Sequence, residues 1–196
     1  YQTAYLKANY PVEFMAALLS GDIPGRNFKK KDALVEHMED CARMQIEVLP
    51  PDVNRSDVDF SVSGKQIHFA LSAIKGCGGS AGEAIVAERQ RSGPFRDLFD
   101  FCNRVDIKKL NKRVMEKLIL SGAMDRLGPH RAALMATLEE AMRAAEQHAK
   151  AQAVGQVDMF GVLTEEIDDV KKAFANVPHW PDKVWLEGER ETLGLY

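Results

Sequence analysis

The sequence lacks the features that mark several common classes of protein. Cysteine is scarce, with three residues far apart, and none of their spacings is that of a metal site. There is no run of about 18 apolar residues, so we expect no membrane-spanning helix. The N-terminus carries neither a start methionine nor a signal peptide. We therefore expect an internal piece of a longer chain, from a reducing cytoplasmic compartment.

A strong net charge is also missing. The 196 residues include 26 lysines and arginines against 29 aspartates and glutamates, for a formal net charge of −3. Any contact with nucleic acid must therefore be local, because a protein that binds it over a whole surface is strongly basic. A hydrophobic content of 45% and a charged content of 28% are ordinary for a globular protein. The length suits one sizeable core or two small ones.

The most informative stretch is a glycine-rich turn that follows an apolar, strand-like run. The turn contains Gly76, Gly78 and Gly79, and we expect a helix from about Ser80. Glycine lets a backbone approach another molecule closely, and the free N–H groups at a helix start are a ready phosphate site. The pattern resembles a helix-hairpin-helix, a motif that contacts the DNA backbone without reading bases. A glycine-rich helix cap without a ligand is the alternative, since short glycine motifs often match by chance.

The remaining patterns predict a mainly helical protein with one small β-hairpin. Alternating apolar residues on both sides of Ser63-Gly64 predict the hairpin, with a second strand that reaches Leu71 and an exposed His68. A strand-like exit before Pro50-Pro51 precedes it. Apolar residues at helical spacing predict helices over residues 1–19 with an interruption at Pro11, 32–44, about 80–91, 108–122 and 130–153. Four apolar residues that follow Pro94 at near-helical spacing are expected in the core: Phe95, Leu98, Phe99 and Phe101.

One region is locally basic. Its cations are Arg104, Lys108, Lys109, Lys112, Arg113, Lys117, Arg126 and Arg131, and its only acids are Asp106, Glu116 and Asp125. A charge run of this kind is usually a solvated face. The functional alternative is a surface that follows the backbone of duplex DNA.

Motifs along nearly the whole chain resemble those of bacterial DNA polymerase III alpha subunits, the replicative polymerases of the C family. They follow the family's order: YLKANYPVEFMAALLS at 5–20, LPPDVN at 49–54, AIKG at 73–76, LFDFC at 98–102, KKLNKRVMEKLILSGAMDRLGPHRAALM at 108–135, GQVDMFG at 155–161 and GERETLGLY at 188–196. The resemblance implies the end of the fingers domain over 1–57 and a helix-hairpin-helix DNA-binding region over 58–135. Residues 136–196 would form a helix, a sliding-clamp-binding segment and a linker towards an OB domain.

The resemblance also implies two partners, double-stranded DNA and the beta sliding clamp. The residues expected to contact DNA are Lys75, Gly76, Gly78, Gly79, Ser80, Lys108, Lys109, Lys112 and Arg113. Those expected to contact the clamp are Gln156, Asp158, Met159 and Phe160, which match a motif in which Gln anchors one subsite and a Met-Phe pair fills a hydrophobic pocket. Other subunits of the polymerase III holoenzyme are expected partners, and a membrane is not.

The catalytic centre of the family has no counterpart in this chain. Its polymerase chemistry uses metal-binding palm carboxylates, and no matching pair of aspartates is apparent here. We therefore expect no catalytic residue, metal or cofactor in this chain, and Mg²⁺ for the polymerase as a whole.

Two alternatives use the glycine turn differently. The chain could be the helix-hairpin-helix scaffold of a DNA repair nuclease or ligase, although the QVDMF segment at 156–160 argues against that. It could also be a purely structural helical module. Two departures from the family pattern are the basic run at 24–31 and the unusually small residues at 75–82.

Overall fold

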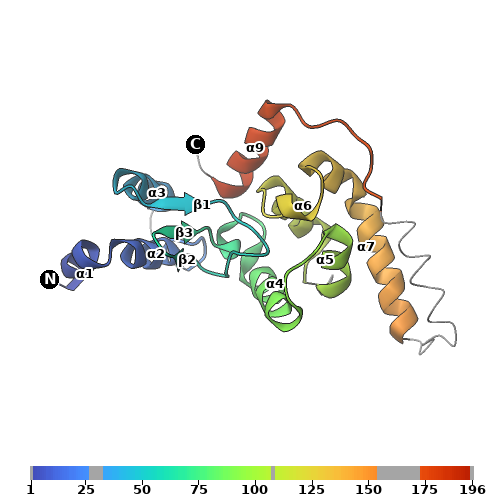
Figure 1. The fold of residues 1–196 in the computed structure, drawn as a ribbon, viewed down its shortest axis with the longest axis horizontal. Coiled ribbons are helices and arrows are strands. Elements are labelled where there is room, and N and C mark those ends of the chain that lie inside the picture. Colours follow the sequence, from blue (N-terminus) through green and yellow to red (C-terminus); the bar gives the residue numbers. More distant parts are fainter. Residues whose placement is uncertain (1, 27–32, 107–108, 154–172, 195–196) are drawn as a thin grey trace.

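Helices dominate the described part of the chain, as the apolar spacing predicts (Figure 1). The computed structural model describes residues 2–26, 33–106, 109–153 and 173–194. Its elements are α1 (Gln2–Asn9), α2 (Pro11–Gly21), α3 (Ala33–Arg43), β1 (Glu47–Leu49), β2 (Ser61–Ser63), β3 (Gln66–His68), η1 (Leu71–Ala73), α4 (Gly78–Ser92), α5 (Leu98–Arg104), α6 (Lys112–Leu120), η2 (Asp125–Leu127), α7 (Arg131–Ala153) and α9 (Asp182–Leu193). The expected fold class, mainly α with a small hairpin, is confirmed.

Pro11 divides the first expected helix into two. Proline lacks a backbone N–H group and suits the first position of a helix, so α2 begins at Pro11. α1 has no buried residue, whereas α2 buries Met15, Ala16 and Leu19 against the core. The helix that joins the rest of the protein is therefore α2.

A three-stranded sheet lies beside α2 and α3 (Figure 1). β2 and β3 form the predicted antiparallel hairpin, in which Val62 lies opposite Ile67 and Gly64 adopts a φ of +62° in the turn. β1 pairs with β3 in parallel, with Val48 opposite Ile67, so the strand order is β1-β3-β2. Ile67 is fully buried at the centre of this sheet.

The chain leaves the sheet earlier than the alternation predicts. β3 ends at His68, and Leu71–Ala73 form a short 3₁₀ turn. The N–H groups of Leu71 and Ser72 donate to the carbonyls of Asp57 and Val58, so they are not available to extend the strand. The expectation of an exposed His68 is also wrong: the residue is half-buried, because it lines a pocket together with Pro50, Arg126 and Trp185.

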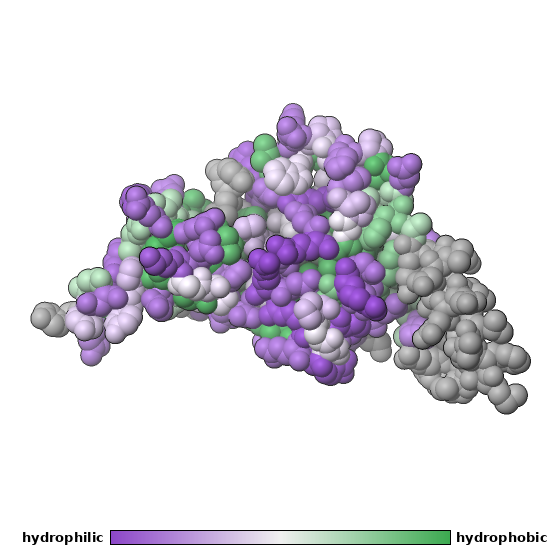
Figure 2. All heavy atoms as spheres, viewed as in Figure 1, coloured by the Kyte–Doolittle hydropathy of each residue, from purple (hydrophilic) through white to green (hydrophobic). Residues whose placement is uncertain are grey.

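The buried side chains form one continuous hydrophobic cluster from α2 to α9. The four residues expected in the core around α5, Phe95 among them, are buried as predicted. Members of the cluster lie on both sides of Asp57 and of Met135, the proposed boundaries of the three parts. The division into parts therefore stays a prediction. On the face that Figure 2 shows, hydrophilic residues cover the middle of the molecule, and hydrophobic residues show through over the α2–α3 end.

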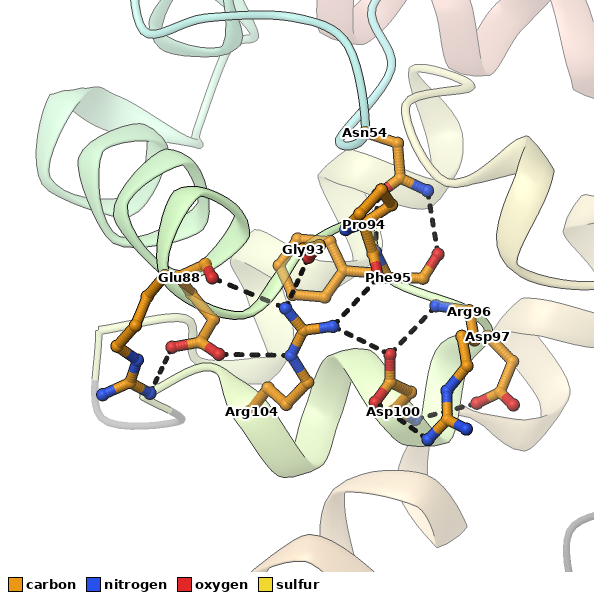
Figure 3. A network of polar contacts seen from close by, with 10 residues as sticks. Asn54, Glu88, Gly93, Pro94, Phe95, Arg96, Asp97, Asp100 and Arg104 are labelled. Atoms are coloured by element: carbon orange, nitrogen blue, oxygen red, sulfur yellow. Dashed lines mark hydrogen bonds and ion pairs between the residues drawn. The ribbon is translucent and has the colours of Figure 1, made fainter.

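A polar network fixes the connection between α4 and α5 (Figure 3). Arg104 donates to Glu88 Oε1 at 3.1 Å and to Asp100 Oδ2 at 3.0 Å. Asn54 bonds both main-chain groups of Phe95, since its Oδ1 accepts from the N–H at 2.8 Å and its Nδ2 donates to the carbonyl at 2.9 Å. The LPPDVN loop and the α4–α5 turn are thereby tied together.

Candidate nucleic-acid interface

The glycine turn joins η1 to α4. Gly76 and Gly78 have φ values of +91° and +71°, a left-handed conformation that favours glycine. α4 begins at Gly78 and not near Ser80, so Gly78 and Gly79 belong to its first turn. Cys77, the residue before the helix, makes no capping hydrogen bond with its side chain. Gly78, Gly79 and Ser80 are exposed, so the N–H groups at this helix start face solvent.

Cys77 anchors the turn from inside. Its side chain is buried, and burial raises the pKa of the thiol to about 12. The thiol is therefore neutral and unreactive at physiological pH. Its N–H donates to the carbonyl of Ile74 at 3.0 Å, which closes the turn.

α6 and the turn before it supply the other half of the site. Asn111 caps α6, where its Oδ1 accepts from the N–H of Val114 at 3.1 Å. An open pocket of about 480 Å³ lies between the glycine turn and α6. Its lining residues are Lys75, Gly76, Asn111, Arg113, Val114, Lys117 and Glu191. The fold thus brings described residues of the two stretches that the sequence suggests for DNA contact to one pocket, Lys75 and Gly76 from the first and Arg113 from the second.

The two halves approach each other most closely at Gly76. A Cβ atom at this position would lie 3.2 Å from Cγ of Lys117. The aliphatic stem of Lys117 therefore covers the turn, and its ammonium group reaches the pocket. Only a residue without a side chain leaves room for this packing at a positive φ.

The residues predicted to bind DNA do not all lie at this pocket. Lys75, Gly76 and Arg113 line the pocket and are exposed. Gly78, Gly79 and Ser80 form the exposed start of α4, and Lys109 is exposed before α6. The described residues do not include Lys108, nor the predicted clamp contacts Gln156, Asp158, Met159 and Phe160. The roles of all these residues stay predictions.

Lys112 lies on the side of α6 that faces α7. Its ammonium group forms an ion pair with the carboxylate of Glu139. That hydrogen bond raises the pKa of Lys112 and lowers the pKa of Glu139. Both side chains are more than half exposed, so a phosphate can still reach Lys112.

The basic region is less basic in space than in sequence. Most of its cations have carboxylate partners: Arg104 with Glu88 and Asp100, Lys112 with Glu139, Lys117 with Glu191, Arg126 with Asp52, and Arg131 with Asp125 and Glu189. Most of these acids come from segments outside 104–131, so the local count of charges could not find them. Arg131 is buried, and its role is to hold α9 and η2 in place.

Sequence reasoning missed Glu191 as part of this site. Glu191 is near the end of α9, more than 70 residues after Lys117, and its side chain is 62% exposed. α9 is held at the turn by the N–H of Lys75, which donates to the carbonyl of Thr192 at 2.8 Å. No local pattern in the sequence signals this return of the chain.

Two features are absent from the part of the chain that the structure describes: a metal-binding cluster and a membrane-spanning helix. Within it, no three His, Cys, Asp or Glu side chains are grouped so that they could hold a metal ion. No described helix is long and apolar enough to cross a membrane. The expectation that this chain binds no metal stays a prediction.

Known proteins are similar to this chain both in one motif and over its whole length. The family model described as a helix-hairpin-helix motif matches residues 45–134. The chain is 54% identical over 197 residues to the DNA polymerase III subunit alpha of Vibrio cholerae and 53% identical to that of Escherichia coli K12. It is 43% identical over 213 residues to that of Pseudomonas aeruginosa. The alignments cover 100% of this chain but only 17% to 18% of these relatives.

Proposed function

Because the whole chain aligns with a segment of bacterial DNA polymerase III alpha subunits, it belongs to that family, and we propose that it binds duplex DNA and tethers the polymerase to a beta sliding clamp. The observation that carries the DNA contact is the pocket between the glycine turn and α6. In this proposal the chain serves a DNA-directed DNA polymerase of the cytoplasm, together with other holoenzyme subunits. Mg²⁺ for nucleotidyl transfer would be held by carboxylates in other parts of the subunit.

The start of α4 offers donors for a phosphate of the DNA backbone. The first N–H groups of a helix have no partner within the helix, and the helix dipole favours an anion there. At Gly78, Gly79 and Ser80 these groups are exposed, and glycine adds no side chain to obstruct them. Lys75 and Arg113 add positive charge at the neighbouring pocket. Such contacts position the duplex without reading its bases.

The clamp contact is proposed for Gln156 to Phe160, which follow α7 in the sequence. α7 extends away from the body of the molecule, and its residues 146–150 are exposed (Figure 1). A clamp motif and a DNA contact in one chain raise the effective concentration of each partner for the other. Two weak contacts would then act as one strong contact, as processive synthesis requires.

The DNA contact is tested in the intact subunit with the double variant Lys75→Ala/Arg113→Ala. Its affinity for duplexes of unrelated sequence should fall alike, because the lost charges face the phosphate backbone. The slope of log K against log salt concentration should shrink by about 2, since each lost phosphate contact releases about one counterion fewer. Fluorescence anisotropy across a salt series measures both quantities. The control Arg43→Ala/Lys183→Ala removes two charges outside the pocket lining and should change neither; equal effects in both variants would contradict the proposal.

The clamp contact is tested with Met159→Ala/Phe160→Ala. This variant should lose binding to purified beta clamp and keep its affinity for duplex DNA. The matched control Val162→Ala/Leu163→Ala shortens two apolar side chains just outside the motif and should keep both activities. Unchanged clamp binding in the Met159→Ala/Phe160→Ala variant would remove the tether from the proposal and leave the DNA contact standing.

A further inference from the structure

We propose that Glu191 is a built-in competitor of the DNA phosphate: its carboxylate holds Lys117 until a phosphate of the duplex takes its place. This inference rests on the proposed contact between the pocket and duplex DNA. It adds a residue from α9, far away in the sequence, that sets how tightly and how selectively the pocket binds an anion.

The charges of the pocket single out Glu191. Among the residues that line it, Lys75, Arg113 and Lys117 are cations, and Glu191 is the one acid. Its carboxylate forms an ion pair with the ammonium group of Lys117. The stem of Lys117 in turn covers Gly76, so the carboxylate lies beside the glycine turn. An anion therefore already occupies the place where a phosphate would meet Lys117.

The backbone of Glu191 is held in place while its side chain is free to turn. The N–H of Lys75 donates to the carbonyl of Thr192, the next residue, at 2.8 Å. Two residues earlier, the carboxylate of Glu189 accepts a hydrogen bond from Arg131 Nη2 at 2.8 Å, which anchors this turn of α9 to buried Arg131. The side chain of Glu191 itself is 62% exposed, against 20% for Lys117. The carboxylate can therefore rotate into solvent without α9 leaving the body.

This arrangement favours duplex DNA over small anions. An isolated anion that enters the pocket must displace Glu191 and gains only the contacts that it makes at one point. A duplex presents several phosphates, so that Lys75, Arg113 and the start of α4 can contribute at the same time. Displacing the carboxylate thus costs binding free energy, and only a ligand with several phosphates offsets this cost through its other contacts.

The test is Glu191→Gln in the intact subunit. Removing this charge should raise the affinity for duplex DNA about fivefold at low salt, the effect of one unit charge a few ångströms away in a water-like dielectric. The difference in duplex affinity between Glu191→Gln and the original protein should narrow as the salt concentration rises, because salt screens the charge of Glu191.

A matched control lies one turn earlier on the same helix. Glu187→Gln removes the same charge from an exposed side chain that pairs with Lys183 at 4.0 Å and does not line the pocket. It should leave duplex binding nearly unchanged. If Glu191→Gln changes affinity no more than Glu187→Gln, or weakens binding, the inference is overturned.

A second variant asks whether Glu191 acts through Lys117. Lys117→Met keeps an unbranched stem over Gly76 and removes the cation. In that background Glu191→Gln should raise the affinity for duplex DNA no more than Glu187→Gln does, because no ammonium group is left to release. A full effect in the Lys117→Met background would overturn the inference. So would a gain in affinity that appears only together with loss of hydrogen-exchange protection in α9, since the cause would then be undocking of the helix.

The outcomes separate this inference from the function on which it rests. If Lys75→Ala/Arg113→Ala weakens duplex binding and Glu191→Gln has no effect, the DNA contact stands and the competitor role is wrong. If neither variant changes duplex binding, both proposals fail.

Discussion

At position 76, the backbone conformation and the packing both require glycine. Its φ is +91°, and a Cβ atom would lie 3.2 Å from Cγ of Lys117. Gly79, three residues later, has no positive φ and no atom within 4 Å of the position of a Cβ. Within one motif, conformation and packing thus require glycine at position 76 but not at position 79.

Gly76→Ala should destabilise the protein by about 1 kcal/mol or more, because alanine is strained at a positive φ and its methyl group presses on Lys117. It should also weaken duplex binding, since the turn and Lys117 shift together. Thermal unfolding and anisotropy measure the two effects. The control Gly79→Ala should be neutral or slightly stabilising in α4. An equal loss of stability in both variants would show that the turn does not have the conformation described.

The connection between α4 and α5 depends on charge as well as on packing. The carboxyl groups of Glu88 and Asp100 are both largely buried against Arg104. Burial alone would raise the pKa of each, but hydrogen bonds and the charge of Arg104 outweigh it, so both pKa values lie below the ordinary range. Each group therefore stabilises the fold at a pH above its ordinary pKa of about 4 and loses that contribution as the pH falls through the folded value.

Arg104→Met should lower the free energy of unfolding by about 3 kcal/mol at neutral pH, because two largely buried carboxylates lose the partner that they share. Their other partners, Arg91 and Arg96, are mostly exposed and contribute little. The difference from the original protein should shrink as the pH falls below about 4, where both carboxyls become protonated. Urea unfolding at a series of pH values measures this. The control Arg96→Met also faces Asp100, at 3.6 Å, but its side chain is 84% exposed, so its effect should be small. A loss for Arg104→Met that does not depend on pH would contradict the electrostatic account.

α9 connects distant parts of the molecule. It packs against α6, where Gly188 lies beside Leu120: a Cβ on this glycine would be 3.0 Å from Leu120 Cδ2 and 3.4 Å from its carbonyl oxygen. Arg131, the first residue of α7, contacts α9 twice, through Glu189 and through the ring of Trp185 at 4.5 Å. The glycine turn, α6 and α7 thus share one partner helix.

Gly188→Ala should loosen α9, although alanine in a helix interior ordinarily stabilises by about 1 kcal/mol relative to glycine. Here the added methyl group meets both the side chain and the backbone of Leu120, and overpacking of this kind costs about 1–3 kcal/mol. Hydrogen exchange should become faster in α9 and the thermal midpoint should fall. Glu187→Ala, at an exposed position on the same helix, should not lower the midpoint. A rise in the midpoint for Gly188→Ala would mean that α9 does not pack on α6 as described.

Local sequence was sufficient to predict most of the helices, strands and turns. The break at Pro11, the hairpin around Ser63-Gly64 and the glycine turn before α4 were all foreseen, because each depends on the conformational preferences of a few neighbouring residues. The core around α5 was foreseen as well, since aromatic residues at helical spacing face one side. The end of β3 was not, because the hydrogen bonds that end it come from Asp57 and Val58.

Long-range pairing was decided by the tertiary structure alone. Several contacts join residues that are far apart in the chain: the parallel pairing of β1 with β3, the ion pairs of Arg126 with Asp52 and of Arg131 with Glu189, and the position of Glu191 at the pocket. Spacing and composition act over a few residues, whereas these contacts depend on where the folded chain returns. The residues of the glycine turn could therefore be read from the sequence, but the ion pair between Lys117 and Glu191 is set by the packing of α9 against α6.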